Sequence, residues 1–541
     1  MSRGVALPAF VTRYPRLSTF DRVNLIDATI AVLEGSYAHL RQKRARYGID
    51  PVERLRALRD QAEGMLDRRF LEEIAAVFTD LRDLHTGVRP PEPLRSGVAV
   101  LPVLVERYLR RDQPVYVVSK VAPGAGAGEL TSGMRVTHWN GVPIDQAVAR
   151  HAARTRGANE PARIARGLES LTVRPLAQHL VPDEHWVDLT FVTPDRRSLT
   201  TRLPWRVITE RSRLGGTGPA GSGARRRRGT AAVALAPVHL AVDPGGEAAQ
   251  QAKRDLFGRR HSGSIRSSLP IFRAEPRGSG RHRVGHLRVW SFLEADHDAV
   301  VDECARLLRA FEAQGCRGVL VDIRGNPGGV VLAAERLLQL FTPNRIEPVR
   351  FAFTPTPLTE AFCTMDPSLR AWLPSITAAA GSGEVYSQAY PITDPDTQAN
   401  GYGWHTPLPA VLIVDPLCYS SADLFAAGWV DNDVGSIVGT GPTTGAGGAN
   451  VWTDADVQLR VDGDSPVRPP ALTGGLDLRV AVRRALRVRA SSGIPIEDIG
   501  VAVPERNVHP TSRRDLLSGN EDLLGVATAR LFEKSAPPPS P

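Results

Sequence analysis

The sequence predicts a multidomain protein with an α/β C-terminal half, a helical N-terminal region and a β-rich module between them. Three observations lead to this expectation. The chain has 541 residues, and single hydrophobic cores stop growing at about 250 to 300 residues. Apolar residues recur at helical spacing up to about Leu84, and after Val284 apolar strands alternate with amphipathic helices, a pattern typical of a sheet covered by helices.

The composition is that of a globular protein, with 42% hydrophobic and 23% charged residues. No stretch approaches the ~20 continuous apolar residues that span a bilayer, so we expect no membrane span. The N-terminus lacks the apolar core of an export signal because Arg13 and Arg16 interrupt it. Four cysteines without CxxC spacing do not indicate a disulfide framework. We therefore expect a cytoplasmic protein.

The net charge of +9 comes almost wholly from arginine. The one dense basic run, Arg225 to Arg228, lies in a glycine-rich segment without interleaved aromatic residues. This favours a solvated linker over a nucleic-acid patch, so no nucleic-acid partner is expected.

Residues 1–90 form the predicted helical region. Ser18 and Asp50, the latter followed by proline, are helix start signals. The last helix ends before Gly87 and leaves His85 at its exit.

Residues 97–207 contain short β-rich runs separated by turn residues. The stretch "VSKVAPGAGAGELTSGMRVTHWNGVPI" resembles a PDZ-type module, which captures extended peptides by adding a strand to its sheet. A purely structural β domain is the alternative. Residues 208–282 are rich in glycine, arginine and serine at both ends, with one helix expected near "GEAAQQAKRDLFG". We interpret them as a flexible linker or a lid.

Residues 283–535 make up the α/β domain, with strands such as "CRGVLVDIRG" and "PAVLIVDP" and a closing helix "NEDLLGVATARLFEK". Within it, "VLIVDPLCYSSADLFAAGWVDND" places Ser420 and Ser421 where a buried strand becomes a helix. A helix N-terminus presents free N–H groups that favour negative charge, as the oxyanion of acyl transfer requires. Ser420 with Asp423 also fits an ordinary capping box, so this turn alone does not identify a nucleophile.

A second turn, in "GVLVDIRGNPGG", follows another buried strand. Its two final glycines, Gly328 and Gly329, allow the backbone to approach a ligand closely and to direct N–H groups at it.

Four motifs occur in order: "LVDIRGNPGG", the Ser420 segment, "IVGTGPTTGAGG" and "GIPIEDIGVAVPE". As an ordered set they resemble the C-terminal processing (tail-specific) peptidases, a family of serine proteases. The resemblance implies that Ser420 is the nucleophile and that Ser421, with Gly328 or Gly329, supplies the oxyanion N–H groups. It also implies a catalytic domain related to the ClpP/crotonase sandwich.

The sequence departs from the lysine-dependent members of that family. They carry a lysine base in the glycine-rich turn, where this chain has Ala446, and no lysine occurs between Lys253 and Lys534. The branch that contains the chlamydial protease-like activity factor is more similar. That resemblance implies a Ser/His/Glu triad with His85 of "RDLHTG" as the base and Glu497 of "GIPIEDIGV" as the acid.

Several alternatives remain open from the sequence. Glu505 is an alternative acid, and His405 and His509 are less favoured bases. No HExxH, CxxC pair or phosphate-binding loop is present, so we expect no metal and no cofactor.

The predicted function is a serine endopeptidase acting on protein or peptide substrates, with a homodimer as a candidate assembly. One rival is a catalytically inactive scaffold that binds peptides or small hydrophobic ligands. The other, a crotonase-like acyl-transforming enzyme, leaves the PDZ-like module and His85 unexplained.

Overall fold

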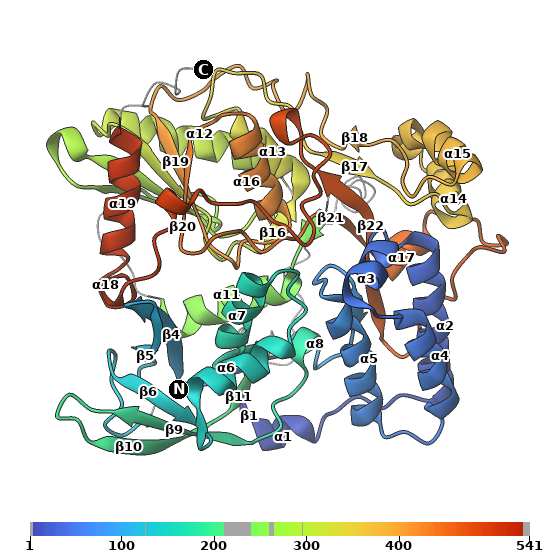
Figure 1. Cartoon of the computed structure of the whole chain (residues 1–541), viewed down its shortest axis with the longest axis horizontal. Helices are drawn as coiled ribbons and strands as arrows, with labels where there is room; N and C mark the ends of the chain where they lie inside the picture. Colours follow the sequence, from blue (N-terminus) through green and yellow to red (C-terminus); the bar gives the residue numbers. More distant parts are fainter. Residues whose placement is uncertain (1–3, 125, 210–239, 259–263, 295, 534–541) are drawn as a thin grey trace, which may run out of the picture.

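The computed structural model describes residues 4–124, 126–209, 240–258, 264–294 and 296–533. Figure 1 shows an N-terminal group of helices, a β-rich part beside it, and a helix-covered sheet that spans one side of the molecule. The expected mixed α/β architecture with several sheets is confirmed.

The N-terminal helices begin where the sequence predicts. Ser18 caps α2 through a capping box with Asp21, and Asp50 accepts hydrogen bonds from the first N–H groups of α4. The elements of this region are β1 (Val5–Ala6), α1 (Leu7–Val11), α2 (Thr19–Ser36), α3 (Leu40–Tyr47), α4 (Pro51–Gln61), α5 (Asp67–Leu81) and β2 (Gly87–Arg89).

The β-rich part contains two sheets, ordered β1-β11-β3-β8 and β10-β9-β6-β5-β4, with β7 paired to β6. It also contains helices α6 and α7, which the sequence analysis did not predict. Its elements are β3 (Val98–Val100), β4 (Val103–Arg110), β5 (Gln113–Val121), β6 (Arg135–Trp139), β7 (Val142–Pro143), α6 (Ile144–Ala153), α7 (Glu160–Ser170), β8 (Val173–Pro175), α8 (Leu176–His179), β9 (Trp186–Val192), β10 (Ser198–Pro204) and β11 (Arg206–Ile208).

Most of the central part of the expected linker 208–282, including the Arg225 to Arg228 run, lies outside the described residues. Residues 240–258 and 264–282 differ from the flexible linker expected there. They form β12 (Leu240–Val242), the predicted helix as α11 (Pro244–Phe257), and β13 (Phe272–Arg277). The physical reason is an apolar face on α11, because Ala249, Ala252 and Phe257 are buried against strands β3 and β8.

The main sheet of the C-terminal half has the order β13-β14-β15-β19-β20, parallel except for β13. Successive strand residues face opposite layers. Leu320 and Val411 pack with Leu523 of α19, whereas Val321 and Leu412 belong to the larger core that includes the helices on the other face. Helices α12, α13 and α16 lie on that face, opposite α19 (Figure 1).

A second sheet, β18-β17-β22-β2 with β21 paired to β22, joins the N-terminal region to this half. The remaining elements are β14 (Val284–Val289), α12 (His297–Ala313), β15 (Val319–Asp322), β16 (Gly328–Val330), α13 (Val331–Leu338), β17 (Arg350–Ala352), α14 (Pro357–Met365), α15 (Leu373–Ser382), β18 (Tyr390–Pro391), β19 (Ala410–Val414), α16 (Ser421–Asp431), β20 (Ser436–Gly439), β21 (Ala449–Thr453), α17 (Asp454–Gln458), β22 (Asp477–Leu486), α18 (Arg513–Leu517) and α19 (Glu521–Phe532).

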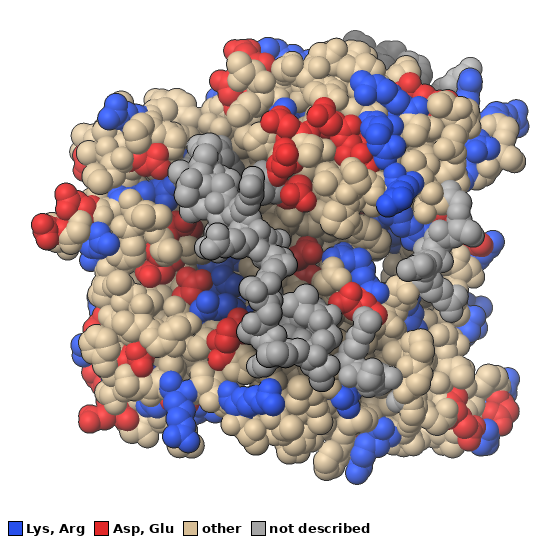
Figure 2. All heavy atoms as spheres, turned by 180° about the vertical axis from the view of Figure 1, so that it is seen from behind, with Lys and Arg blue, Asp and Glu red and all other residues tan. Residues whose placement is uncertain are grey.

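Basic and acidic side chains occur in several separate groups on the face shown in Figure 2. Among the described residues, no helix combines the length and apolar character needed to cross a membrane. All four cysteines are buried and unpaired.

Candidate active site

Ser420 occupies the turn between β19 and α16. Its backbone has φ +67° and ψ −124°, a sparsely populated conformation for a residue other than glycine, which persists only where surrounding contacts hold it. Two contacts do so. The Asp423 carboxylate accepts the Ser420 N–H at 2.9 Å, and the preceding residue, Tyr419, donates its N–H to the Asn326 carbonyl at 3.0 Å.

His85 lies in the loop between α5 and β2. The Asp83 carboxylate accepts the backbone N–H of His85 at 2.8 Å and the Thr86 hydroxyl at 2.9 Å. Strand β2 then pairs with β22, with Val88 opposite Leu478. This pairing places the His85 loop beside the nucleophile turn.

The two loops meet at one short contact. His85 Nε2 lies 2.6 Å from Ser420 Oγ, and both side chains are fully buried. Tyr419 reinforces the contact, because its ring lies 4.7 Å from the imidazole and its hydroxyl accepts the Leu84 N–H at 3.2 Å. A hydroxyl hydrogen-bonded to an imidazole is the arrangement that lets a serine lose its proton as it attacks.

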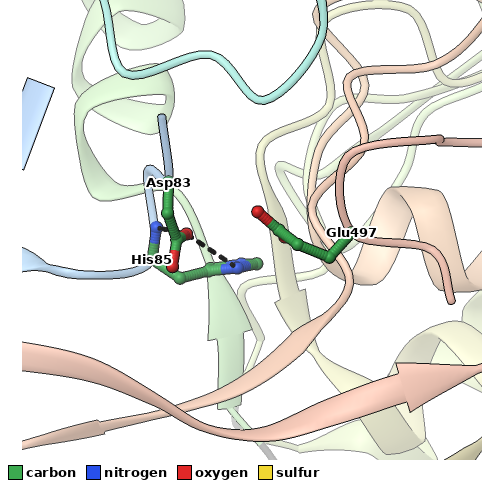
Figure 3. A group of neighbouring side chains, drawn as sticks. All are labelled: Asp83, His85 and Glu497. Carbon is green, nitrogen blue, oxygen red and sulfur yellow. Dashed lines mark hydrogen bonds and ion pairs between the residues drawn. The ribbon is translucent and has the colours of Figure 1, made fainter. Parts of the chain in front are cut away.

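Two carboxylates lie close to the imidazole. Figure 3 shows Asp83 and Glu497 flanking His85, and one side-chain ligand atom from each of the three residues lies within 4.8 Å of the others. Asp83 Oδ1 is 3.8 Å from His85 Nδ1, which is beyond hydrogen-bond distance. Among the described residues, this buried Nδ1 has no hydrogen-bond partner.

Glu497 is held by two other groups. Lys43 Nζ lies 2.7 Å from Glu497 Oε1, and the Gly448 N–H donates to Oε2 at 3.2 Å. The Lys43 ammonium therefore already occupies one of the Glu497 oxygens, Oε1, that a metal ion in the Asp83, His85 and Glu497 group would use as a ligand.

Burial controls the protonation of these groups. It lowers the pKa of His85 to about 3, against the opposing effect of Asp83, so the imidazole is neutral and able to accept a proton near pH 7. Burial, together with the charges of Asp83 and Asp498, raises the pKa of Glu497 well above its usual value, although the Lys43 ammonium opposes this shift.

The candidate oxyanion groups lie where β16 meets the start of α16. Gly328 and Gly329 have φ +92° and +153°, and the Ser421 hydroxyl donates to the Gly329 carbonyl at 3.1 Å. The Gly328 N–H donates to Asn326 Oδ1 at 2.9 Å, a partner that an oxyanion would have to replace.

The segment after β12 packs on the same glycine turn. Strand β12 pairs antiparallel with β16, and the Asp243 N–H donates to the Pro327 carbonyl at 2.8 Å. Asp243 is fully buried and accepts from Arg166 Nη1 at 2.7 Å and from Gln178.

The alternatives left open by the sequence lie elsewhere. Glu505 and His405 are exposed, and His509 is paired with Asp515 at 2.8 Å. Ala446, at the place of the lysine in other family branches, donates its N–H to Asp423 at 3.1 Å.

Sequence reasoning missed the contributions of Asp83, Lys43 and Tyr419. Asp83 lies two residues before the predicted base His85, and Tyr419 directly precedes the predicted nucleophile Ser420. Their closeness in the sequence to these residues is a signal that could have identified them. Lys43 lies in a helix with no recognisable motif.

The comparisons with known proteins agree with the predicted family. Residues 283–462 match the model described as "Peptidase family S41". A stretch of 79 residues is 34% identical to the carboxy-terminal processing protease CtpB of Bacillus subtilis, and the match covers 14% of this chain and 15% of the length of that relative.

Two solved structures resemble nearly the whole chain. Mature CPAF complexed with lactacystin has a TM-score of 0.65 at 17% identity, covering 94% of this chain and 98% of that one. Mature CPAF alone has a TM-score of 0.64 at 17% identity, covering 94% and 96%. At this identity the likeness shows a shared fold. Together with the family match, it agrees with the predicted relationship to C-terminal processing peptidases.

Proposed function

Because residues 283–462 carry a domain of peptidase family S41, we propose that this protein is a serine endopeptidase with Ser420, His85 and Glu497 as its triad. The observation that supports this most is the 2.6 Å contact between His85 Nε2 and Ser420 Oγ. It provides the base within hydrogen-bond reach of the nucleophile that acyl transfer requires.

In the first half of the reaction, Ser420 Oγ bonds to the substrate carbonyl carbon while its proton passes to His85 Nε2. The carbonyl oxygen becomes an oxyanion, bound by N–H groups of Ser421 and of Gly328 or Gly329. Collapse of this intermediate breaks the C–N bond, and His85 returns the proton to the leaving amine. A water molecule then releases the acyl group by the same steps.

Glu497 orients His85 and stabilises its protonated form in this scheme. Its full burial and its position within 4.8 Å of the imidazole support the role over Glu505, which is exposed.

At the level of the fold, we propose that the catalytic domain is a ClpP/crotonase-like sandwich and that residues 97–207 are a PDZ-like module for extended peptides. The Asn140–Gly141 turn between β6 and β7 supports the latter, since both residues have positive φ, +48° and +75°, as a type I′ hairpin requires.

The burial of Ser420 and His85 favours a second candidate, an inactive scaffold. The same burial fits an active enzyme whose site is covered by residues 240–258. Such a cover would agree with the lid expected within residues 208–282. Intact mass and peptide mapping after fluorophosphonate treatment separate these cases. The proposal expects one adduct on Ser420, absent in Ser420→Ala and strongly slowed in His85→Ala.

His405→Ala is the matched control, because this histidine is exposed and should leave labelling unchanged. The same treatment is applied to a variant in which the packing of residues 240–258 is destabilised. If neither this variant nor folded wild type forms an adduct, the result supports the inactive scaffold and overturns the proposed peptidase activity.

A further inference from the structure

Lysine 43, on α3 of the N-terminal region, is buried against the proposed triad acid. Its side chain has no exposure, and Nζ lies 2.7 Å from Glu497 Oε1 and 2.5 Å from Asp498 Oδ1. Lys43 Nζ also donates a hydrogen bond to the Arg82 carbonyl at 3.3 Å. A lysine so deeply buried is unusual unless it is paired, and these three hydrogen-bond partners belong to the Glu497–Asp498 turn and to the segment just before His85.

The same helix holds the residue that follows the triad acid. Gln42 Nε2 donates to Asp498 Oδ2 at 2.8 Å, and the Tyr47 hydroxyl donates to Asp498 Oδ1 at 3.0 Å. Asp498 has φ +67°, a conformation that needs support in a residue other than glycine. We call Gln42, Lys43 and Tyr47 the α3 clamp, because together they fix the Glu497–Asp498 turn.

We propose that Lys43 is a positioning residue for catalysis, which favours the ionised form of Glu497 and holds its carboxylate beside His85. The inference rests on the proposed Ser420/His85/Glu497 triad, and it gives the N-terminal helices a second contribution to the site besides His85.

The electrostatic reason is the cost of a buried charge. A carboxylate removed from water favours its protonated form, and an opposite charge within about 4 to 6 Å lowers its pKa by about 1 to 3 units. A protonated Glu497 could not stabilise the imidazolium that forms during acyl transfer. Burial would lower the pKa of Lys43, but Glu497 and Asp498 outweigh this and raise it above its usual value, so the lysine is the permanent cation of the cluster.

Other titratable groups also surround Glu497. They are His85, Asp83, Asp498 and the Tyr37 and Tyr419 phenols. The carboxylates among them favour a protonated Glu497 and thus increase the dependence on Lys43.

The test compares Lys43→Met with two other variants. Lys43→Arg keeps the charge, and Arg44→Met removes a neighbouring cation of α3 that pairs with the partly exposed Asp50. Rates of fluorophosphonate labelling at Ser420 are measured against pH. In Lys43→Met, the fall of the labelling rate on the acid side of the pH profile (the acid limb) should shift to higher pH by about 1 to 3 pH units. The rate should recover at high pH. Lys43→Arg should restore most of the wild-type profile, and Arg44→Met should match wild type.

A role through Glu497 also predicts non-additivity. In a Glu497→Gln background, Lys43→Met should cause no further shift of the acid limb. An unshifted profile in folded Lys43→Met, or an equal shift with and without Glu497, would overturn the proposal.

Two further steps keep the test decisive. If Lys43→Met does not fold, Lys43→Met/Asp498→Asn keeps the net charge of the cluster and takes its place. If wild-type Ser420 does not label, the proposed peptidase fails, and infrared spectroscopy tests Lys43 separately. The protonated-carboxyl band of Glu497 should persist to higher pH in the lysine variant than in wild type and disappear when Glu497→Gln is added, and an unchanged titration of this band in the folded variant would overturn the role of Lys43.

Discussion

His85 Nε2 and Ser420 Oγ are 2.6 Å apart although 335 positions separate the residues in the chain. Antiparallel pairing of β2 with β22 brings the two loops together, and the Ala481 N–H of β22 donates to the Thr86 hydroxyl at 3.1 Å. The site therefore exists only when the N-terminal helices are docked on the α/β domain.

The two carboxylates near His85 should differ in what they do. Asp83 already accepts hydrogen bonds from the His85 N–H and from Thr86, so Asp83→Asn should mainly destabilise the fold, by about 1 to 3 kcal/mol. Glu497→Gln should slow Ser420 labelling by about 10³- to 10⁴-fold with the fold retained. Chemical unfolding and labelling kinetics measure the two effects. If folded Asp83→Asn loses as much rate as Glu497→Gln, then Asp83 is the triad acid.

Gly329 should not tolerate a side chain. A Cβ there would lie 2.1 Å from the Phe292 carbonyl carbon, in a backbone with φ +153°, so Gly329→Ala must displace β16 and the candidate oxyanion groups. We expect loss of labelling and a lower melting temperature. Gly525→Ala in α19 is the control, because nothing lies within 4 Å of its added Cβ, and the change should stabilise the protein by about 0.5 to 1 kcal/mol. A Gly329→Ala protein that labels like wild type would contradict this account of the turn.

Asp423 should make stability depend on pH. Burial raises its pKa to about 7, despite hydrogen bonds from Thr444 and from the Gly447, Ala446 and Ser420 N–H groups. The folded state therefore binds more protons than the unfolded state between about pH 4 and pH 7, and this group's contribution to the unfolding free energy falls as pH rises, on the order of 1 kcal/mol per unit.

Urea unfolding at several pH values tests this against Asp423→Asn, which should have a shallower fall over that range. Parallel curves for the two proteins would show that Asp423 is ionised throughout.

Asp243 should control access to Ser420. It caps α11 by accepting the Gly245 N–H at 3.0 Å, and it holds Arg166. Asp243→Ala should loosen residues 240–258 by about 1 kcal/mol or more and accelerate fluorophosphonate labelling by at least about fivefold. Asp296→Ala removes the same kind of cap from α12 and should leave the rate unchanged. If wild type and folded Asp243→Ala label at equal rates, residues 240–258 do not restrict access to Ser420.

The sequence by itself indicated the resemblance to C-terminal processing peptidases, the alternation of strands and helices from Val284, and the turn that carries Ser420. These features are local, because each depends on the order of residues within a short segment. Long-range packing decided the rest. Only the tertiary structure brought Lys43 to Glu497, left Asp83 and Glu497 both beside His85, and buried α11 through its apolar face. A buried ion pair between α3 and a loop more than 450 positions later has no signature in either segment, since only the assembled fold brings the two charges close enough for their attraction to offset the cost of removing them from water.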